Sequence, residues 1–222
     1  MARLDLLQLD LTDECPLFCS HCSNSSGPQL RSALQYAAAE QAIIDAADLG
    51  CRELKFSGGE PLRYADLAKL LVLSQQLDMN PTIFTTGIRD MRTRGPLSDR
   101  EWGELKALGL SAAVFSVYSG PANRIFHNRI VRLGPLGARD AFEANQLGLL
   151  RARGAGVAVE LQFLPSDETC SELYDVVDWA VSVGACRLHL QYPTGQGRNR
   201  DNAALAVSHI GEPILKAMSL AL

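Results

Sequence analysis

Residues 51–77 read CRELKFSGGEPLRYADLAKLLVLSQQL and contain three local patterns in succession. Residues 51–57 are short, partly apolar and followed by two glycines, which is typical of a strand. Residues 65–77 carry leucines at helical spacing, which is typical of an amphipathic helix. Strand, glycine-rich turn and helix in this order form a βα unit, so this stretch predicts an α/β fold.

The same alternation continues on both sides of this unit. Further strands are expected over residues 4–11, 81–86, 111–118, 157–163 and 187–191. Further helices are expected over 33–49, from Ser98, over about 138–153, over 168–183 and from about 202. Strands joined by helical crossovers are parallel, and a closed eight-unit barrel takes about 250 residues. The 222 residues therefore predict a single domain, 1–222, folded as a partial, open (β/α)6 TIM-like barrel with parallel strands.

Two of these helices carry start signals. Ser98 is followed three residues later by Glu101, which is a capping box. Ser32 is a possible N-cap for the helix over 33–49, and Gly50 lies just past its end. The segment after residue 118 is rich in glycine and arginine and is predicted to be a loop.

Composition and charge exclude several classes of protein. Hydrophobic residues make up 47% of the chain and charged residues 21%, which is typical of a folded domain. A formal net charge of -4 gives no basic field for a nucleic acid, and no apolar run approaches the ~20 residues that span a bilayer. Six cysteines are too few for a disulfide scaffold, and no apolar signal run precedes Asp5, so a cytoplasmic location is expected.

Three cysteines follow the first expected strand within eight residues. Cys15, Cys19 and Cys22 have the spacing C-x3-C-x2-C, and close thiolates favour a soft metal. A structural zinc site needs a fourth ligand, and His21 is adjacent to Cys22, which makes joint ligation of one tetrahedral ion difficult. A four-iron cluster held by three cysteines leaves one iron open. From the spacing alone, an iron-sulfur cluster, zinc and coincidence all remain open.

The second expected strand ends in Gly58, Gly59, Glu60 and Pro61. Two glycines allow a close approach of the backbone to a ligand, and a carboxylate accepts hydrogen bonds from an ammonium group. In isolation this is an ordinary glycine-rich turn. At the end of the strand that follows the cysteine loop, it indicates a site shared with the cysteines, because working residues of such barrels lie at the carboxyl ends of strands.

Together these motifs resemble the radical S-adenosylmethionine (radical SAM) superfamily. The resemblance implies that Cys15, Cys19 and Cys22 hold a [4Fe-4S] cluster, whose open iron chelates SAM, and that Gly58 to Pro61 form the site of its amino group. Similarity to further family segments implies additional cofactor contacts by Thr85, Ser116, Gln162, Pro193 and Gly195. The family usually has an aromatic residue before the third cysteine; here it is His21, whose imidazole is expected to stack near the adenine, with a solvated loop histidine as the alternative.

The resemblance also implies a reaction and a redox partner. Reductive cleavage of SAM gives a 5'-deoxyadenosyl radical that abstracts hydrogen from a substrate. A flavodoxin or ferredoxin is the implied reductant. The reaction subtype, whether epimerisation, crosslinking or dehydrogenation, and the catalytic residue at the substrate stay unassigned.

Two segments resemble members that modify ribosomally made peptides. These are residues 115–119, FSVYS, and residues 22–28, CSNSSGP. The C-terminal auxiliary-cluster (SPASM) domain usual in those members is not expected in this chain. A ribosomal peptide is therefore the first substrate hypothesis, and a sugar, nucleoside or other small metabolite is the second. A non-catalytic iron-sulfur or zinc-binding module is the alternative of another class, and the motif over 58–61 argues against it.

Other polar residues have weaker patterns. Candidates for substrate contact near the strand ends, each with a structural role as the alternative, are Tyr118, Glu160, Gln162, Gln191 and Tyr192. A basic segment can contact an anion or form a solvated loop; its members are Arg124, His127, Arg129 and Arg132. The remaining cysteines are expected to be buried apolar thiols, and they are Cys51, Cys170 and Cys186.

Overall fold

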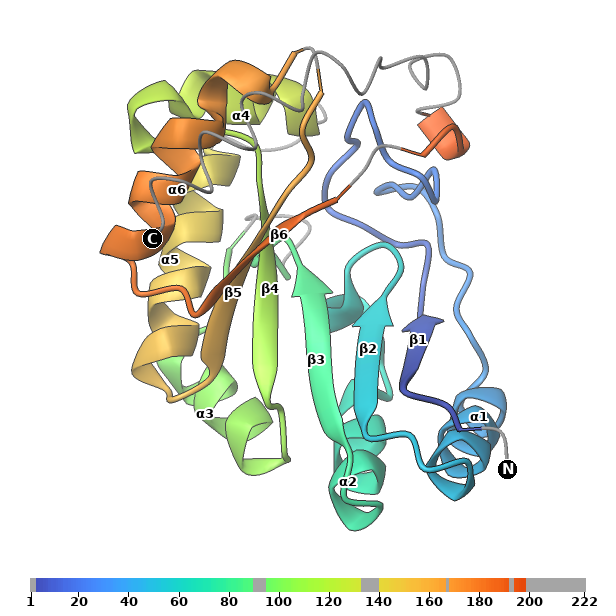
Figure 1. The fold of residues 1–222 in the computed structure, drawn as a ribbon. Helices are drawn as coiled ribbons and strands as arrows, with labels where there is room; N and C mark the ends of the chain where they lie inside the picture. Colours follow the sequence, from blue (N-terminus) through green and yellow to red (C-terminus); the bar gives the residue numbers. More distant parts are fainter. Residues whose placement is uncertain (1–2, 90–94, 133–139, 167, 192–193, 199–222) are drawn as a thin grey trace.

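A six-stranded parallel sheet forms the centre of the part of the chain that the structure describes (Figure 1). The computed structural model describes residues 3–89, 95–132, 140–166, 168–191 and 194–198. The strands are β1 (Leu6–Asp10), β2 (Glu53–Ser57), β3 (Asn80–Thr85), β4 (Ala112–Val117), β5 (Ala158–Phe163) and β6 (Arg187–Leu190). They are hydrogen-bonded in sequence order, with β1 and β6 at the two ends. The predicted open, partial barrel with parallel strands is confirmed.

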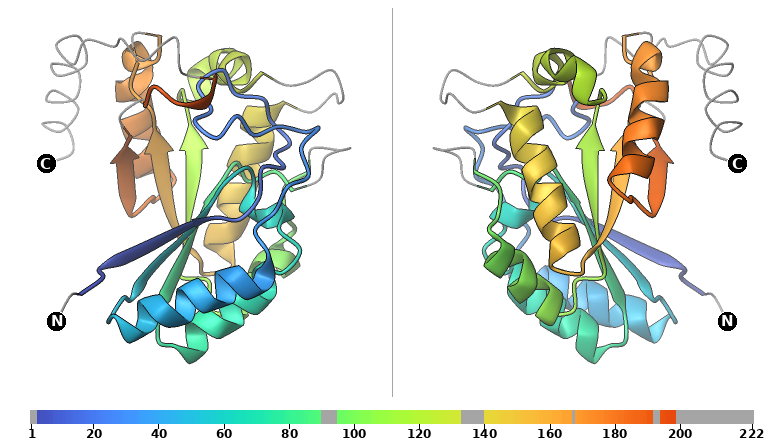
Figure 2. Two further views of the ribbon diagram at one scale, coloured as in Figure 1. Left: turned by 90° about the vertical axis from the view of Figure 1, so that its right-hand side faces the viewer. Right: turned by 90° about the vertical axis from the view of Figure 1, so that its left-hand side faces the viewer.

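Helices connect the strands and cover one face of the sheet (Figure 2). They are α1 (Tyr36–Asp48), α2 (Leu67–Gln76), α3 (Asp99–Ala107), α4 (Arg124–Val131), α5 (Ala141–Gly154) and α6 (Leu173–Ser182), with short 3-10 turns η1 (Pro61–Arg63), η2 (Pro121–Asn123) and η3 (Cys170–Glu172). No helix in the described ranges is long and apolar enough to cross a membrane.

Alternation along the strands separates an apolar face from a polar one. Phe56, Phe115 and Leu161 are fully buried under the helices. Their neighbours in the chain point to the opposite face, because successive strand residues alternate. Burial of one such apolar side chain contributes about 1.5–3 kcal/mol, so the helix-covered face supplies most of the core. The other face is left to line a cavity.

Helix boundaries agree with the sequence in part. The capping box of Ser98 and Glu101 is confirmed at the start of α3. Ser32 is not the N-cap of α1, because that helix begins after Gln35. The carbonyl of Ser32 instead accepts hydrogen bonds from the hydroxyl of Thr12 and the amide of Asp13, just before the cysteines. The expected helix from about 202, together with Tyr192 and Pro193, lies outside the described residues.

The basic segment after β4 was predicted to be a loop, and this is wrong. It forms α4, which buries His127, Ile130 and Val131 on one side. Its arginines face outward and form ion pairs, as between Arg129 and Glu168 at 3.1 Å. Spacings of three and four residues between buried positions are the ordinary period of a helix, and they favour α4 over a loop.

Burial of the remaining cysteines differs from the prediction at two positions. Cys51 is buried, as predicted. Cys170 is only partly buried and Cys186 is exposed, so the prediction is wrong for both. Cys186 lies immediately before β6, an end strand that pairs only with β5 in the described part of the chain, and its Sγ contacts the carbonyl of Val159 on β5 at 3.3 Å.

Candidate cofactor site

A cavity of about 400 Å³ lies at the carboxyl ends of the strands. Its lining combines residues of the cysteine loop, of the turn after β2 and of β3 to β6. The predicted site residues that line it are Cys15, Cys19, His21, Cys22, Gly58, Gly59, Thr85, Ser116 and Gln162. The fold therefore brings together, in one cavity, motifs that are spread over about 150 residues of sequence.

The cysteine loop is held by backbone hydrogen bonds rather than by regular structure. The amide of Cys15 donates to the carbonyl of Gly27 at 3.2 Å. The amides of Phe18 and Ser20 donate to the carbonyls of Val131 and Ile130, each at 3.1 Å. The last turn of α4 thus supports the middle of the loop, and its free carbonyls are used in doing so.

Burial disfavours free thiolates in this loop. It raises the pKa of Cys15 well above its usual range, and neighbouring Cys19 and Glu60 add to the effect. Burial, together with the neighbouring Cys22, raises the pKa of Cys19 to about 12. Metal binding requires deprotonated thiols, so positive charge from a metal must offset this cost.

The three thiols lie around one cavity, and this arrangement fits a group held by several cysteines. Within the described ranges, no three His, Cys, Asp or Glu side chains converge closely enough to hold one metal ion. Cys15, Cys19 and Cys22 nevertheless line the same cavity, as does Ser26, whose buried hydroxyl oxygen has no partner within the described residues. Thiolates spread around a cavity can each bind a different iron of a cluster, and such clusters are held by cysteine.

The turn after β2 packs directly on the cysteine loop. The amide of Gly59 donates to the carbonyl of Thr12 at 2.5 Å, and the amide of Glu60 donates to that of Glu14 at 2.8 Å. A Cβ at Gly58 would lie 2.5 Å from the oxygen of Thr12, and one at Gly59 only 2.2 Å from that of Glu14. The two glycines are therefore required for contact between two segments of this chain.

Glu60 lies behind the cavity wall. Its carboxylate is fully buried and accepts hydrogen bonds from the hydroxyl of Thr85, from the hydroxyl and amide of Thr86 and from the amide of Leu62. Burial raises the pKa of Glu60, against the opposing effect of the hydrogen bonds from Thr86 and Thr85. Pro61 follows as the buried first residue of η1. Glu60 thus ties the end of β2 to the end of β3.

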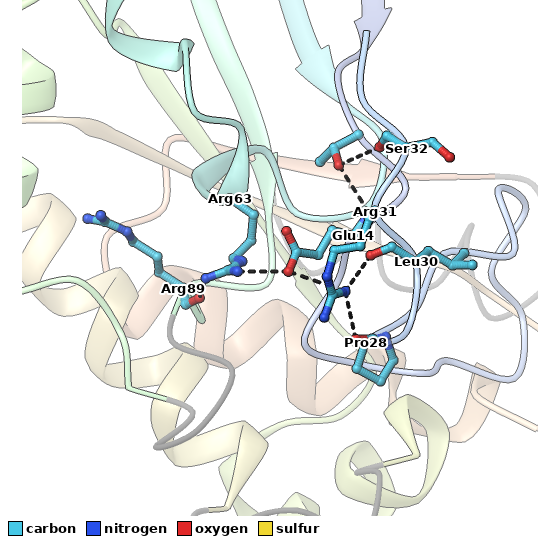
Figure 3. Close-up of polar contacts among 8 residues, drawn as sticks. Glu14, Pro28, Leu30, Arg31, Ser32, Arg63 and Arg89 are labelled. Atoms are coloured by element: carbon cyan, nitrogen blue, oxygen red, sulfur yellow. Dashed lines mark hydrogen bonds and ion pairs between the residues drawn. The ribbon is translucent and has the colours of Figure 1, made fainter.

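Charged side chains also join the turn after β2 to the cysteine loop (Figure 3). Nη2 of Arg63 lies 2.7 Å from Oε1 of Glu14, the residue before the first cysteine. Nη1 of Arg63 donates to the carbonyl of Arg89 at 3.2 Å. Arg31 reaches the same Glu14 oxygen at 3.5 Å from a more exposed position. The cysteine loop, the turn after β2 and the segment after β3 therefore form one connected unit.

One family model matches the part of the chain that contains the cysteine loop and the turn after β2. The family model of the radical SAM superfamily matches residues 9–159, which contain all three cysteines and the turn. The chain belongs to the radical SAM superfamily.

Individual relatives cover the radical SAM domain but extend beyond it. PqqA peptide cyclase of Gluconobacter oxydans is 27% identical over 199 residues, which are 88% of this chain and 52% of the relative. PqqA peptide cyclase of Xanthomonas axonopodis is 30% identical over 158 residues, 71% of this chain and 37% of the relative. This chain therefore spans about half the length, or less, of these curated relatives.

Solved structures of radical SAM proteins share the fold. Streptococcus suis SuiB bound to its precursor peptide SuiA aligns with a TM-score of 0.71 at 15% identity, over 99% of this chain and 47% of SuiB. The protein anSMEcpe with bound AdoMet aligns with a TM-score of 0.67 at 16% identity, over 86% of this chain and 50% of its own. At these identities the likeness concerns the arrangement of strands and helices.

His21 departs from the usual radical SAM pattern and is fixed by an aromatic partner. Its Nε2 lies 2.8 Å from the hydroxyl of Tyr118, and the two ring centroids are 4.5 Å apart. Burial and the nearby Arg198 lower the pKa of His21 to about 4, so the imidazole is neutral. Tyr118 in turn contacts His127: Nδ1 of His127 accepts a hydrogen bond from the backbone amide of Tyr118 at 3.4 Å. His21 is therefore half-buried and held, not solvated.

Asn145 of α5 is a cavity residue that sequence reasoning missed. Its Nδ2 donates to the carbonyl of Thr86 at 2.9 Å and to that of Ser116 at 3.2 Å, which joins the ends of β3 and β4. Its Oδ1 is buried without a partner among the described residues. A polar residue on an otherwise buried helix face is the signal that could have identified it.

The far wall of the cavity is formed by β5 and β6. Gln162 contacts Gln191, and its own Oε1 is buried without a partner in the described part of the chain. Below them, Glu160 lies 2.5 Å from Nε2 of His189, which also lines the cavity. Thr194 is a lining residue, whereas Gly195 lies in the exposed turn beyond it. The candidates Gln162 and Gln191 thus line one wall, whereas Glu160 is not a lining residue and contacts the wall through His189.

Proposed function

We propose that this chain is the core of a radical SAM enzyme that modifies a ribosomally made peptide. Three cysteine thiols line one cavity with Gly58 and Gly59, and the backbone of the turn is hydrogen-bonded to the carbonyls of Thr12 and Glu14, just before the first cysteine; this arrangement carries the proposal. Cys15, Cys19 and Cys22 would hold a [4Fe-4S] cluster, and SAM would occupy the adjoining space between them and β4 to β6.

The residues around this space would bind and orient the cofactors. Gly58 and Gly59 form the corner expected to take the SAM ammonium group, and the buried negative charge of Glu60 favours a cation there. Glu60 also fixes Thr85 and Thr86, which line the same corner. His21, held by Tyr118, presents a neutral ring to the adenine.

The other residues of the cavity would control access of water and substrate. Apolar side chains from several segments form one side of it, and they are Leu17, Ile88, Tyr118, Val131, Ala141 and Leu164. The chemistry that the bound cofactors supply is reductive cleavage of SAM to a 5'-deoxyadenosyl radical, which removes hydrogen from the substrate. An apolar wall limits side reactions of such a species with solvent.

A peptide substrate is supported by the curated relatives, which act on PqqA peptide. The wall made by Gln162, His189 and Gln191 offers hydrogen-bonding groups to a peptide side chain or backbone. The electron donor in this proposal is a flavodoxin or a ferredoxin.

The proposal is tested by anaerobic reconstitution with iron and sulfide, followed by SAM and dithionite. We expect 5'-deoxyadenosine, detected by mass spectrometry, from the parent protein and from the control Cys186→Ala, and none from Cys19→Ala. With a uniformly deuterated PqqA-type precursor peptide, the 5'-deoxyadenosine that is formed should contain deuterium. A colourless, zinc-loaded protein after reconstitution contradicts the enzyme, and unlabelled 5'-deoxyadenosine contradicts this substrate class.

A further inference from the structure

The segment after β6 returns to the cysteine loop at the opposite end of the sheet. Nε of Arg198 donates to the carbonyl of Cys19 at 2.7 Å, and Nη2 donates to the carbonyl of Ser26 at 2.7 Å. The backbone amide of Arg198 donates to the carbonyl of Cys22 at 3.0 Å. One residue therefore binds the loop at three carbonyls, two of which belong to predicted metal ligands.

A fourth contact involves an aromatic ring. The guanidinium carbon of Arg198 lies 3.9 Å from the ring centroid of Phe18, the neighbour of Cys19. A planar guanidinium can stack on a ring while its edge donates two hydrogen bonds, which an ammonium group cannot reproduce. The residue type at position 198 is thus matched to this contact.

The preceding residue shows that the close approach of the two segments is specific. Gly197 has a φ of +57°, and a Cβ on it would lie 2.3 Å from the oxygen of Ser23 and 2.4 Å from that of Cys22. Both are backbone atoms, which cannot move aside as the end of a flexible side chain can. Only glycine allows Arg198 to reach the loop from this direction.

We propose that Arg198 is a positioning residue that locks the cysteine loop in its metal-binding conformation. Its two hydrogen bonds and its stacking on Phe18 fix the carbonyls on either side of Cys22, and so restrict where the thiols of Cys19 and Cys22 point. It also places a fixed positive charge beside the cysteines. Iron-sulfur potentials depend on nearby charge. The positive charge of Arg198 favours the reduced cluster, which carries more negative charge than the oxidised one, and so raises the midpoint potential. The electrostatic part rests on the proposed function, and the positioning part does not.

Hydrogen exchange of the metal-free, reduced full-length protein tests the positioning part without any cofactor. In Arg198→Gln, amides over residues 15–26 should exchange about tenfold faster, since loss of a charged hydrogen-bonding group removes that much protection. Arg198→Lys should give only partial protection. Arg151→Gln is the matched control, because Arg151 also donates to a backbone carbonyl, that of Leu97, but away from the loop. Unchanged exchange over the loop in Arg198→Gln overturns the proposal, as does faster exchange throughout β3 and β4, which would indicate general unfolding.

Potentiometry of the reconstituted protein tests the electrostatic part. Arg198→Gln should have a more negative cluster midpoint potential than the parent, whereas Arg198→Lys, which keeps the charge, should stay near the parent value. Equal potentials in Arg198→Gln and the parent overturn this part. If the parent itself assembles no cluster, the proposed function fails, while the exchange measurement still decides whether Arg198 holds the loop.

Discussion

Thr86 donates both its hydroxyl and its backbone amide to one oxygen of Glu60, at 2.6 and 2.7 Å. This pair joins two strand ends beneath the cavity and leaves the carboxylate surrounded by hydrogen-bond donors. The resemblance to radical SAM proteins gives Glu60 a role in binding the SAM amino group. The geometry adds a role inside the protein, because removal of Glu60 also releases Thr85 and Thr86.

Glu60→Ala should weaken SAM binding about tenfold or more, because a buried negative charge and the order of the Thr85–Thr86 segment are both lost. The visible absorption of the cluster should stay, since Glu60 is not a ligand. Equilibrium dialysis with SAM and absorption spectra of the reconstituted variant measure the two effects. Equal SAM affinity in variant and parent would show that the amine site is elsewhere.

Glu60→Gln should destabilise the fold although the side chain keeps its shape. Both oxygens of Glu60 accept hydrogen bonds from Thr85 or Thr86. In glutamine an NH2 group replaces one of these oxygens, so two buried donors face each other and neither has an acceptor. The expected loss is about 1–3 kcal/mol in the free energy of unfolding. Urea unfolding of the metal-free protein measures it, and a variant as stable as the parent contradicts the described hydrogen bonds.

His127 should make stability depend on pH. Burial lowers the pKa of His127 to about 3, against about 6.5 in the unfolded chain. As pH falls below about 6.5, the unfolded state gains a proton that the folded state does not, so stability is lost. Between pH 7 and pH 5 the free energy of unfolding of the parent should fall by about 2 kcal/mol more than that of His127→Phe, which has no group that titrates at this position. Parallel pH profiles of unfolding free energy for the two proteins would refute a neutral, buried His127.

Gly59→Ala should be strongly destabilising, because its Cβ would lie 2.2 Å from the backbone oxygen of Glu14. Gly103→Ala is the matched control, because nothing lies within 4 Å of its Cβ and it occupies the middle of α3. The control should gain about 0.5–1 kcal/mol from the higher helix propensity of alanine. Thermal unfolding of both variants should therefore shift in opposite directions, and similar shifts would count against the packing of the turn on the loop.

The ion pair of Glu14 and Arg63 should be energetically coupled. Both side chains are mostly buried, at 14% and 28% exposure, so solvent screens them less than a surface pair. A double-mutant cycle with Glu14→Gln and Arg63→Gln should give a coupling of about 1 kcal/mol. The same cycle with the more exposed Arg31 should give less. Equal couplings for the two arginines would contradict the geometry of Figure 3.

The strand and helix order was predictable because each unit carries its own signals. Apolar runs bounded by glycine mark the strands, and the capping box at Ser98 marks α3. The helix α4 was missed because its arginines and the surrounding glycines outweighed the helical spacing of His127, Ile130 and Val131. Local composition favoured a loop, whereas burial against the cysteine loop stabilises a helix.

The candidate site was predictable where residues form a contiguous motif. The cysteines and the turn over 58–61 are such motifs, and all three cysteines line the cavity with Gly58 and Gly59. The contacts made by Asn145 and Arg198 could not be predicted, since their partners are main-chain carbonyls on segments distant in sequence. Backbone carbonyls have no residue identity, so a sequence carries little information on which side chain reaches them.

Mössbauer spectroscopy of anaerobically reconstituted, ⁵⁷Fe-labelled protein distinguishes the irons of one cluster, and it therefore measures whether the three cysteines hold a cluster with one open iron. We expect a [4Fe-4S] spectrum in which one iron of four changes its parameters when SAM is added, since Cys15, Cys19 and Cys22 supply three ligands. A spectrum without such a cluster, or one that is identical with and without SAM, would contradict it.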